Sequence, residues 1–478
     1  MIARSLAALA DVTGGTLSGI DPGAAAGLMI DAAVVTDSRE AVPGSLYVAR
    51  VGASADGHEF IAAAAASGAR AALVTRDVGP LPRLVVPDEQ AAFAAIARHL
   101  IDSSPDLAVV GITGSSGKTS TKDLLGQVLA AAGETVAPIG SYNSEVGVPL
   151  TVCRMTPTTR YLVVELGARG LGHVRYLTQI APPSIGIVLN VGSAHVGEFG
   201  SRAAIAEAKS ELVQALPARG LAILNADDPL VAAMAERTPA RVVLVGESPA
   251  ADLRATDIEL APDGTASFRV ASAHGTAQVR LAVAGRHQVG NALAVIAAAL
   301  ELGMPLDRVV SVLATCHPVS RYRMEVSERA DGVTIVNDAY NANPESMTAA
   351  LDTLAVMGAG RRIIAVLGPM LELGEESGAA HRAVGAAAAA RGVHTLIVVG
   401  DLAREIGAGA KIGAGAGEAD PGLSIRYAAD LDSAYDLAVD IVAAGDIVLV
   451  KSSNGAGLRF LGDRLRDAPV PQEEENSC

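Results

Sequence analysis

Short apolar runs alternate with longer helical patterns over most of the chain. A run of about 4–8 apolar residues is typical of a strand buried on both faces of a parallel sheet, whereas apolar positions with a period of about 3.6 predict a helix. The predicted strands cover residues 107–112, 161–164, 185–189, 221–224, 332–336, 363–367, 395–399 and 446–450. Because strands and helices alternate, the pattern predicts an α/β protein with parallel sheets.

The chain is expected to divide into three domains, since its 478 residues suffice for about that number. Residues 1–105 are predicted to form an N-terminal α/β domain that begins with a short helix. Residues 106–315 are predicted to form a central domain with a parallel sheet, and residues 316–478 a C-terminal Rossmann-like domain. The glycine-rich piece 407–417 is expected to be a flexible surface insert, and the acidic segment 472–476 suggests no role.

The stretch 112–120, Ile-Thr-Gly-Ser-Ser-Gly-Lys-Thr-Ser, joins a predicted strand to a predicted helix. Gly114 and Gly117 allow backbone N–H groups to surround phosphate oxygens at the positive end of that helix. Lys118 supplies a charge, and Thr119 offers a hydroxyl to a magnesium ion. The sequence therefore predicts a site for a nucleoside triphosphate. The strict phosphate-loop pattern would have glycine at position 112, so an ordinary turn is the alternative interpretation.

Polar residues follow three of the predicted central strands: Glu165, Asn190 and Asn225. The carboxyl ends of parallel strands line the ligand crevice, so these side chains are expected to gather around the glycine-rich turn. Glu165 is then the natural acidic metal ligand, with a surface carboxylate as the alternative. His195, just past another strand, is a second candidate ligand, although a lone histidine is often a structural residue.

Three further candidates are open to more than one interpretation. Lys209 lies on a predicted amphipathic helix capped by Ser201, and on sequence alone it reads as a surface lysine. Asn291 lies at the start of an alanine-rich helix, where its amide can read an adenine edge or satisfy the helix cap. The cluster 36–39, Thr-Asp-Ser-Arg, can contact a diphosphate or form a solvated turn with an internal ion pair.

Net charge and cysteine content limit the possible binding partners and the cellular compartment. The net charge of −15 argues against a nucleic-acid or acidic-membrane partner, because either would require a broad basic face. No apolar run approaches the roughly 20 residues of a membrane span. Cys153, Cys316 and Cys478 are widely separated, which favours a reducing cytoplasm over a disulfide framework. A monomer is taken as the default oligomeric state.

Five motifs together carry a family resemblance. They are Thr-Gly-Ser-Ser-Gly-Lys-Thr at 113–119, Tyr-Asn-Ser-Glu-Val-Gly-Val-Pro-Leu-Thr at 142–151, Glu-Leu-Gly-Ala at 165–168, Asn-Asp-Ala-Tyr-Asn-Ala-Asn-Pro-Glu-Ser-Met at 337–347 and Leu-Glu-Leu-Gly-Glu at 371–375. Over nearly the whole chain these motifs resemble the Mur ligase family of peptidoglycan synthesis, whose own phosphate loop has the form found at 113–119. The resemblance implies a cytoplasmic, ATP- and Mg²⁺-dependent ligase acting in cell-wall biogenesis, and hence in cell shape and division.

Within the family, the loop at 337–347 points to the member that joins D-alanyl-D-alanine to UDP-N-acetylmuramoyl-tripeptide through an acyl phosphate. In the member that adds a diamino acid, the corresponding loop looks like D-Y-A-H-x-P instead. Two alternatives stay open. One is a ligase that adds a single amino acid to a muramoyl peptide or to folate. The other, from a different class, is a phosphate-loop switch or nucleotide-binding module, which would not need Glu165, His195 or Asp338.

The resemblance also implies residue roles. The phosphates of ATP would contact Gly114, Ser115, Ser116, Gly117, Lys118, Thr119 and Ser120, with adenine on Asn291 and further contacts from Arg323 and Asp338. Magnesium would be held by Thr119, Glu165, His195 and a carbamylated Lys209, so that Lys118, Lys209 and His195 are the expected catalytic residues. The sugar-nucleotide substrate would contact Ser38, Arg39 and Asn143. Pro369, Ser452, Ser141 and Ser144 depart from the usual residues of the family.

Overall fold

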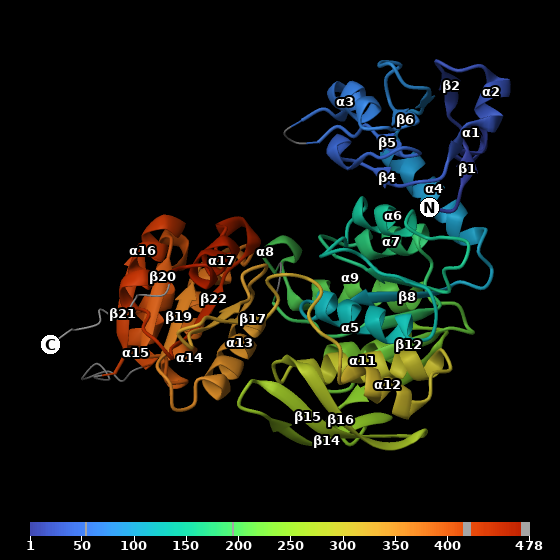
Figure 1. Ribbon diagram of the computed structural model, residues 1–478. Helices are drawn as coiled ribbons and strands as arrows, with labels where there is room; N and C mark the ends of the chain where they lie inside the picture. The colour runs from blue at the N-terminus through green and yellow to red at the C-terminus, as the bar shows by residue number, and fades with distance from the viewer. Residues whose placement is uncertain (53–54, 194–195, 414–421, 470–478) are drawn as a thin grey trace.

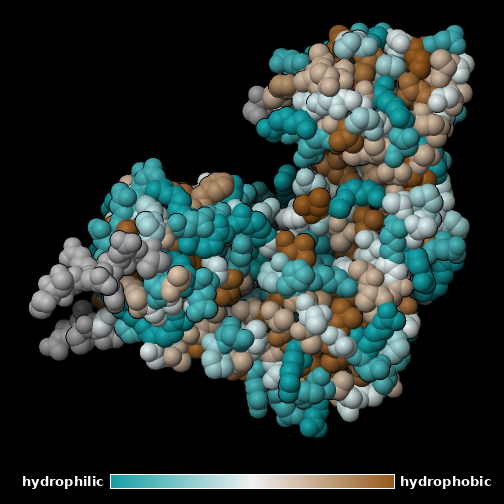
Figure 2. Space-filling view, viewed as in Figure 1, coloured by the Kyte–Doolittle hydropathy of each residue, from teal (hydrophilic) through white to brown (hydrophobic). Residues whose placement is uncertain are grey.

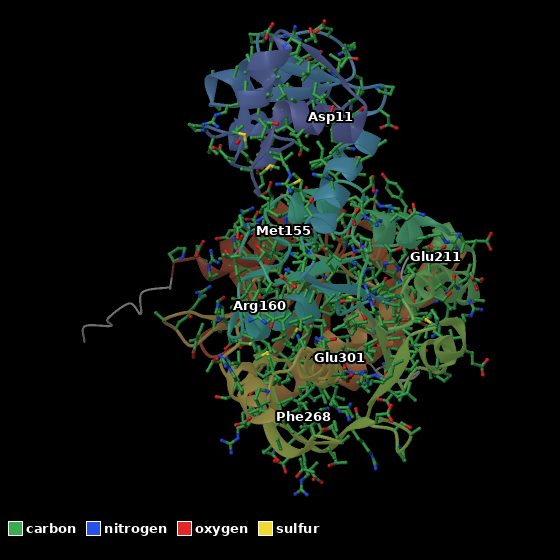
Figure 3. All side chains as sticks on the ribbon, turned by 90° about the vertical axis from the view of Figure 1, so that its right-hand side faces the viewer. Asp11, Met155, Arg160, Glu211, Phe268 and Glu301 are labelled. Carbon is green, nitrogen blue, oxygen red and sulfur yellow. The ribbon has the colours of Figure 1, made fainter. Side chains whose placement is uncertain are left out.

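The computed structural model describes residues 1–52, 55–193, 196–413 and 422–469. Three lobes follow one another along the chain, each built on its own sheet (Figure 1). The N-terminal lobe stands above the central lobe, and the C-terminal lobe lies beside the central one. Figure 3 shows the same arrangement from the side, with Asp11 in the upper lobe and Met155, Arg160 and Phe268 in the body below it. The α/β class with mainly parallel sheets is confirmed.

The N-terminal lobe contains a five-stranded sheet in the order β2-β7-β6-β5-β4. All neighbours pair in parallel except β2, which is antiparallel to β7. The strands are β1 (Arg4–Ser5), β2 (Thr16–Ser18), β3 (Met29–Ile30), β4 (Val34–Val35), β5 (Leu46–Val48), β6 (Ala71–Val74) and β7 (Arg83–Val85), and β1 pairs with β3. The helices are α1 (Leu6–Thr13), α2 (Pro22–Gly27), α3 (Ile61–Ala66) and α4 (Glu89–Asp102). The predicted first helix therefore exists, but it begins at Leu6, where the Ser5 side chain caps it.

The central lobe contains a nine-stranded sheet in the order β16-β15-β14-β13-β12-β11-β8-β10-β9. Its strands are β8 (Ala108–Thr113), β9 (Thr135–Val136), β10 (Tyr161–Glu165), β11 (Ile185–Val188), β12 (Leu221–Asn225), β13 (Arg241–Gly246), β14 (Leu253–Leu260), β15 (Thr265–Ser272) and β16 (Gly275–Ala284). Its helices are α5 (Lys118–Ala130), α6 (Gly147–Val152), α7 (His173–Ile180), α8 (Val196–Phe199), α9 (Arg202–Gln214), α10 (Pro229–Ala232), α11 (Gln288–Glu301) and α12 (Leu306–Leu313). Apolar side chains of α5, α11 and α12 form one core with the sheet, while those of α6, α7 and α9 belong to the core on its other face.

The regular alternation predicted for the whole central domain fails over residues 253–284. There β14, β15 and β16 pair antiparallel and extend the parallel sheet. Along β15, Ala266, Phe268 and Val270 are buried and alternate with more exposed residues. This period of two is typical of a strand with only one buried face, which needs no covering helix on the other.

The C-terminal lobe contains a six-stranded sheet in the order β17-β18-β22-β19-β20-β21, parallel except for β17. The strands are β17 (Glu325–Glu328), β18 (Thr334–Asn337), β19 (Ile363–Leu367), β20 (Thr395–Val399), β21 (Ser424–Ala428) and β22 (Ile447–Lys451). The helices are α13 (Pro344–Met357), α14 (Ser377–Ala390), α15 (Arg404–Gly413), α16 (Leu431–Ile441) and α17 (Arg459–Arg466). No helix in the described ranges is long and apolar enough to cross a membrane.

The prediction of a flexible insert at 407–417 is wrong for residues 407–413, which belong to α15. This helix packs so closely on α14 that side chains would not fit between the two backbones. A Cβ atom on Gly409 would lie 1.9 Å from the Arg382 carbonyl oxygen, and one on Gly385 would lie 1.8 Å from the Ile406 carbonyl oxygen. The glycines therefore serve helix packing rather than flexibility. Residues 414–417 lie outside the described residues.

Candidate active site

A cleft of about 550 Å³ opens between the central and C-terminal lobes. The surface is visibly hollowed where the lobes meet (Figure 2). Most of the predicted site residues line this cleft, although they come from distant parts of the chain. They are Gly114, Ser115, Ser116, Gly117, Lys118, Thr119, Ser120, Asn143, Glu165, Lys209, Asn291, Arg323 and Asp338. The fold thus brings together residues that the sequence motifs had singled out separately.

The glycine-rich turn connects β8 to α5 at the bottom of the cleft. Gly117 caps α5 with a φ of 81°, a left-handed conformation that favours glycine. Lys118 Nζ donates to the Gly114 carbonyl oxygen at 2.7 Å, so the lysine folds back over its own loop. Burial lowers the pKa of Lys118, and the Glu165 carboxylate opposes that shift. The loop presents a helix N-terminus and a lysine to the same space, as phosphate binding requires.

Asn190 braces the same turn from the end of the neighbouring strand. Its backbone carbonyl accepts from Ser115 N–H at 3.0 Å, and its side-chain Oδ1 accepts from Ser116 N–H at 2.9 Å. The prediction that strand-end polar residues gather here is confirmed for Glu165 and Asn190. Asn225 behaves differently, because its side chain donates to the Leu189 carbonyl and does not line the cleft.

Glu165 is the acidic centre of the site and is only 1% exposed. Its carboxylate accepts hydrogen bonds from Thr119 Oγ1 at 2.9 Å, Ser141 Oγ at 3.1 Å and Asn143 Nδ2 at 2.8 Å. The surface-carboxylate interpretation of Glu165 is therefore wrong. The departure at position 141 is also accommodated, since the serine hydroxyl orients the carboxylate.

The oxygen set around Glu165 fits Mg²⁺. This ion uses one or two protein carboxylates together with hydroxyls, water and phosphate oxygens, and it does not need a cage of protein ligands. Thr119 and Glu165 present a hydroxyl and a carboxylate within hydrogen-bond distance of each other at the phosphate loop. Within the described ranges no group of three or more His, Cys, Asp and Glu side chains could hold a metal. A second candidate ligand, His195, lies outside the described residues, so its role stays a prediction.

Lys209 is not the surface residue that its helical context suggested. It is 4% exposed on α9 and lines the cleft. Burial, and secondarily the charge of Lys118, lowers the pKa of Lys209 well below its usual value. No hydrogen bond or ion pair joins its amine to another residue of the described chain. Carbon dioxide reacts with the uncharged form of an amine to give a carbamate, and such a carbamate at Lys209 stays a prediction.

Asn291 lies beside the phosphate loop, on α11. Its side chain is 5% exposed and donates to Gln288 Oε1 at 2.8 Å. A Cβ atom built on Gly117 would lie 2.6 Å from Asn291 Oδ1, so the loop and this amide are in close contact. A residue with a side chain would therefore not fit at position 117 beside the Asn291 amide.

The C-terminal lobe contributes Arg323 and Asp338. Arg323 Nη2 donates to Thr119 Oγ1 at 3.4 Å, and its guanidinium lies 4.4 Å from the centroid of the Tyr340 ring. Asp338 accepts from the Met324 N–H at 3.0 Å, which ties the residue after Arg323 to the polar loop that follows β18. Side chains from the two lobes therefore meet at the phosphate loop.

Two further charged residues, Lys451 and Glu345, line the cleft, although the motifs predicted no role for either. Lys451 is 2% exposed, and its amine donates to Asp338 Oδ2 at 2.6 Å and to the Asn341 carbonyl at 2.9 Å. Burial lowers its pKa, against the pull of Asp338. Glu345 accepts from Ser193 N–H at 2.8 Å and so bridges the lobes. The sequence could have predicted Lys451 as a cleft residue, because it directly follows the predicted strand 446–450.

Ser38 and Arg39 lie in the N-terminal lobe, just after β4, and do not line this cleft. The Arg39 side chain is 87% exposed and forms an ion pair with Asp37. Hydrogen bonds from Arg39 lower the pKa of Asp37 to about 2. The solvated turn with an internal ion pair is thus confirmed, while the contact of Ser38 and Arg39 with the substrate stays a prediction.

Two family models and several relatives match this chain. Residues 112–299 match the Mur ligase middle domain, and residues 322–454 match the glutamate ligase domain of Mur ligases. The UDP-N-acetylmuramoyl-tripeptide--D-alanyl-D-alanine ligase of Mycobacterium tuberculosis H37Rv is 45% identical, over 97% of this chain and 98% of the relative.

Solved structures give the same result. MurF from Acinetobacter baumannii superimposes with a TM-score of 0.85 at 30% identity and covers 97% of this chain and 99% of its own. MurF ligase from Thermotoga maritima in complex with ADP has a TM-score of 0.77 at 27% identity, covering 91% of this chain and 98% of its own.

An α/β protein of three lobes, with a phosphate loop facing polar groups of a further lobe, is the architecture of an ATP-using ligase. The chain belongs to the Mur ligase family, and within it to the MurF group. The resemblance inferred from its motifs is confirmed, as is the prediction of an ATP-dependent ligase. The alternative of a nucleotide-binding switch is excluded by this membership.

Proposed function

We propose that this chain joins D-alanyl-D-alanine to UDP-N-acetylmuramoyl-tripeptide, with conversion of ATP to ADP and phosphate, during cytoplasmic assembly of the peptidoglycan precursor. The relatives that match nearly the full chain carry this activity in their names. The observation that carries the proposal furthest is the cleft, where the phosphate loop, Glu165 and Lys209 of the central lobe face Arg323 and Asp338. Residues 1–105 then bind the sugar nucleotide through Ser38 and Arg39, residues 106–315 bind ATP, and residues 316–478 complete the site as the chain acts as a monomer.

The first step activates an unreactive carboxylate. An oxygen of the terminal carboxylate of the tripeptide attacks the γ-phosphorus of ATP, a bond to the bridging oxygen breaks, and ADP leaves, so that an acyl phosphate forms. Two anions must approach each other, and cationic groups lower that barrier. Lys118 reaches over the phosphate loop, and Arg323 approaches Thr119 from the C-terminal lobe.

Magnesium would be held by Thr119 and Glu165, with His195 and carbamylated Lys209 at a second position. When bound, it neutralises negative charge on the phosphate oxygens and orients them. Ser141 and Asn143 keep the Glu165 carboxylate oriented by donating hydrogen bonds to it. Asn143 also contacts the muramoyl part of the substrate, and Asn291 holds the adenine.

The second step forms the peptide bond. The amine of D-alanyl-D-alanine attacks the acyl carbon, the resulting tetrahedral intermediate expels phosphate, and the nitrogen loses a proton. Closure of the lobes keeps water away from the acyl phosphate, which would otherwise hydrolyse. Arg323 and Asp338 take part only when the lobes meet, so closure and chemistry are coupled.

The test is phosphate release with UDP-N-acetylmuramoyl-tripeptide and a panel of amine substrates. Release that requires both the tripeptide and D-alanyl-D-alanine, with a ligated product of matching mass, supports the proposal. Equal turnover with a free amino acid in place of the dipeptide would contradict it and would point to a ligase that adds one residue.

A further inference from the structure

A buried ion pair lies one helical turn beyond the phosphate loop. Lys122 is 1% exposed on α5, and its amine contacts the carboxylate of Asp123, which is 7% exposed. The same amine donates to the Pro138 carbonyl at 3.0 Å and to Ser320 Oγ at 3.1 Å. Neither charge has a part in the proposed chemistry, and burying charged groups is unfavourable unless their partners are well placed.

The Lys122–Asp123 pair also contacts the segment that joins the central lobe to the C-terminal lobe. Asp123 accepts from Ser320 N–H at 2.9 Å and from Ser320 Oγ at 3.1 Å. One turn further along α5, Gln127 makes a paired contact with His317: its Nε2 donates to the carbonyl at 2.9 Å, and its Oε1 accepts from the N–H at 3.2 Å. Residues 317–320 are therefore fixed to the helix that carries the phosphate loop.

From Arg321 onward the contacts pass to the C-terminal lobe. Arg321 and the Tyr322 hydroxyl both donate to Asp463, at 2.5 and 2.9 Å, and Met324 N–H donates to Asp338 at 3.0 Å. Tyr322 and Met324 have φ angles of 63° and 50°, left-handed conformations that cost energy for residues other than glycine. Arg323 lies between these two strained residues, so the C-terminal lobe holds it firmly in one orientation.

The segment that joins the two lobes is therefore attached to the central lobe up to Ser320 and to the C-terminal lobe from Arg321 onward. We propose that the buried Lys122–Asp123 pair is a positioning element, which fixes the pivot of the C-terminal lobe at Ser320 and thereby sets where Arg323 meets the nucleotide. The proposal rests on the proposed ligase function for its kinetic consequences. Lys122 suits this role because it binds three segments at once.

Each of those segments carries a residue of the cleft. Thr119 lies in the first turn of the helix that carries Lys122, Pro138 precedes Ser141 by three residues, and Ser320 precedes Arg323 by three residues. Ser141 and Arg323 are connected through Thr119, whose Oγ1 contacts both the Ser141 hydroxyl and the Arg323 guanidinium. A single buried ammonium therefore fixes the spacing of three groups that surround the phosphates.

The experiment is a double-mutant cycle between Lys122→Met and Arg323→Ala, with turnover and ADP affinity measured for each variant. If Lys122 acts through Arg323, Lys122→Met lowers kcat at least tenfold in the parent and less than twofold in the Arg323→Ala background. The Kd for ADP stays within threefold, because the phosphate loop is intact. Equal losses in both backgrounds, or an unchanged kcat in the parent, would overturn the proposal.

Two further measurements keep the result unambiguous. Ser320→Ala removes one hydroxyl and leaves the ion pair in place, so it serves in the same cycle if Lys122→Met does not fold, with a kcat loss of at least threefold expected. Hydrogen exchange at Ser320 N–H needs no ligase activity. It should accelerate at least tenfold in Lys122→Met and stay unchanged in Lys411→Met, whose side chain is exposed on α15. Unchanged exchange in Lys122→Met refutes the positioning role even if the ligase assay itself fails.

Discussion

Replacing Gly117 by alanine should separate backbone strain from a steric effect on nucleotide binding. Gly117 has a φ of 81°, and an added methyl group would meet Asn291 Oδ1 at 2.6 Å. The strain of a left-handed alanine costs about 1–2 kcal/mol. That cost is present in both the free and the nucleotide-bound protein, so it lowers stability without changing affinity.

The contact with Asn291 acts differently, because the proposed adenine-binding amide must move to relieve it. Overpacking of this kind costs about 1–3 kcal/mol. If relieving the contact displaces Asn291 from the adenine, most of this free energy is lost from nucleotide binding. The Kd for ADP then rises roughly 10–100-fold, at about 1.4 kcal/mol for each factor of ten. Isothermal titration with ADP measures this change directly.

Gly303→Ala is the matched control. Gly303 has a φ of 84°, and a Cβ atom there would meet nothing within 4 Å. It should lose about the same 1–2 kcal/mol of stability as the strain at Gly117 and keep the parental Kd. Equal ADP affinity of the Gly117→Ala and Gly303→Ala variants would refute the assignment of Asn291 and the loop to the nucleotide.

Two other predictions follow from buried groups. Glu165→Gln keeps the shape and most hydrogen bonds of the carboxylate, so the melting temperature should change little. The magnesium concentration needed for half-maximal phosphate release should rise roughly 10–100-fold. An unchanged magnesium titration would exclude Glu165 as a ligand. Burial lowers the pKa of His381, whose Nε2 accepts from Met370 N–H at 3.0 Å. The unfolded chain therefore binds the proton first, and the free energy of unfolding should fall as the pH drops below about 6.5. Melting curves of His381→Gln should lack this contribution, and an identical pH slope in both proteins would contradict it.

The sequence predicted the site best where the functional residues directly follow a strand. The turn at Gly117 and Lys118 and the carboxylate of Glu165 follow directly from strands whose apolar runs are unmistakable. Because such strands run in parallel, their ends had to meet, and the contact between Thr119 and Glu165 could be anticipated without coordinates.

Features that depend on packing between distant segments were not predictable. Lys209 has the local sequence of a surface lysine, and only the packing of α9 shows that it is buried. Gly409 and Gly413 occur in a stretch that resembles a linker, although they allow α15 to approach α14. Lys122 gave no signal at all, since its partner Ser320 lies in another part of the chain.

The central claim is that the cleft first transfers phosphate to the tripeptide carboxylate and then replaces it with an amine. Labelling both oxygens of that carboxylate with oxygen-18 tests this directly by mass spectrometry of the released phosphate. An acyl phosphate leaves one labelled oxygen in each phosphate and the other in the new amide. Unlabelled phosphate released in step with product formation would show that the carboxylate never bonds to phosphorus, and would contradict the account.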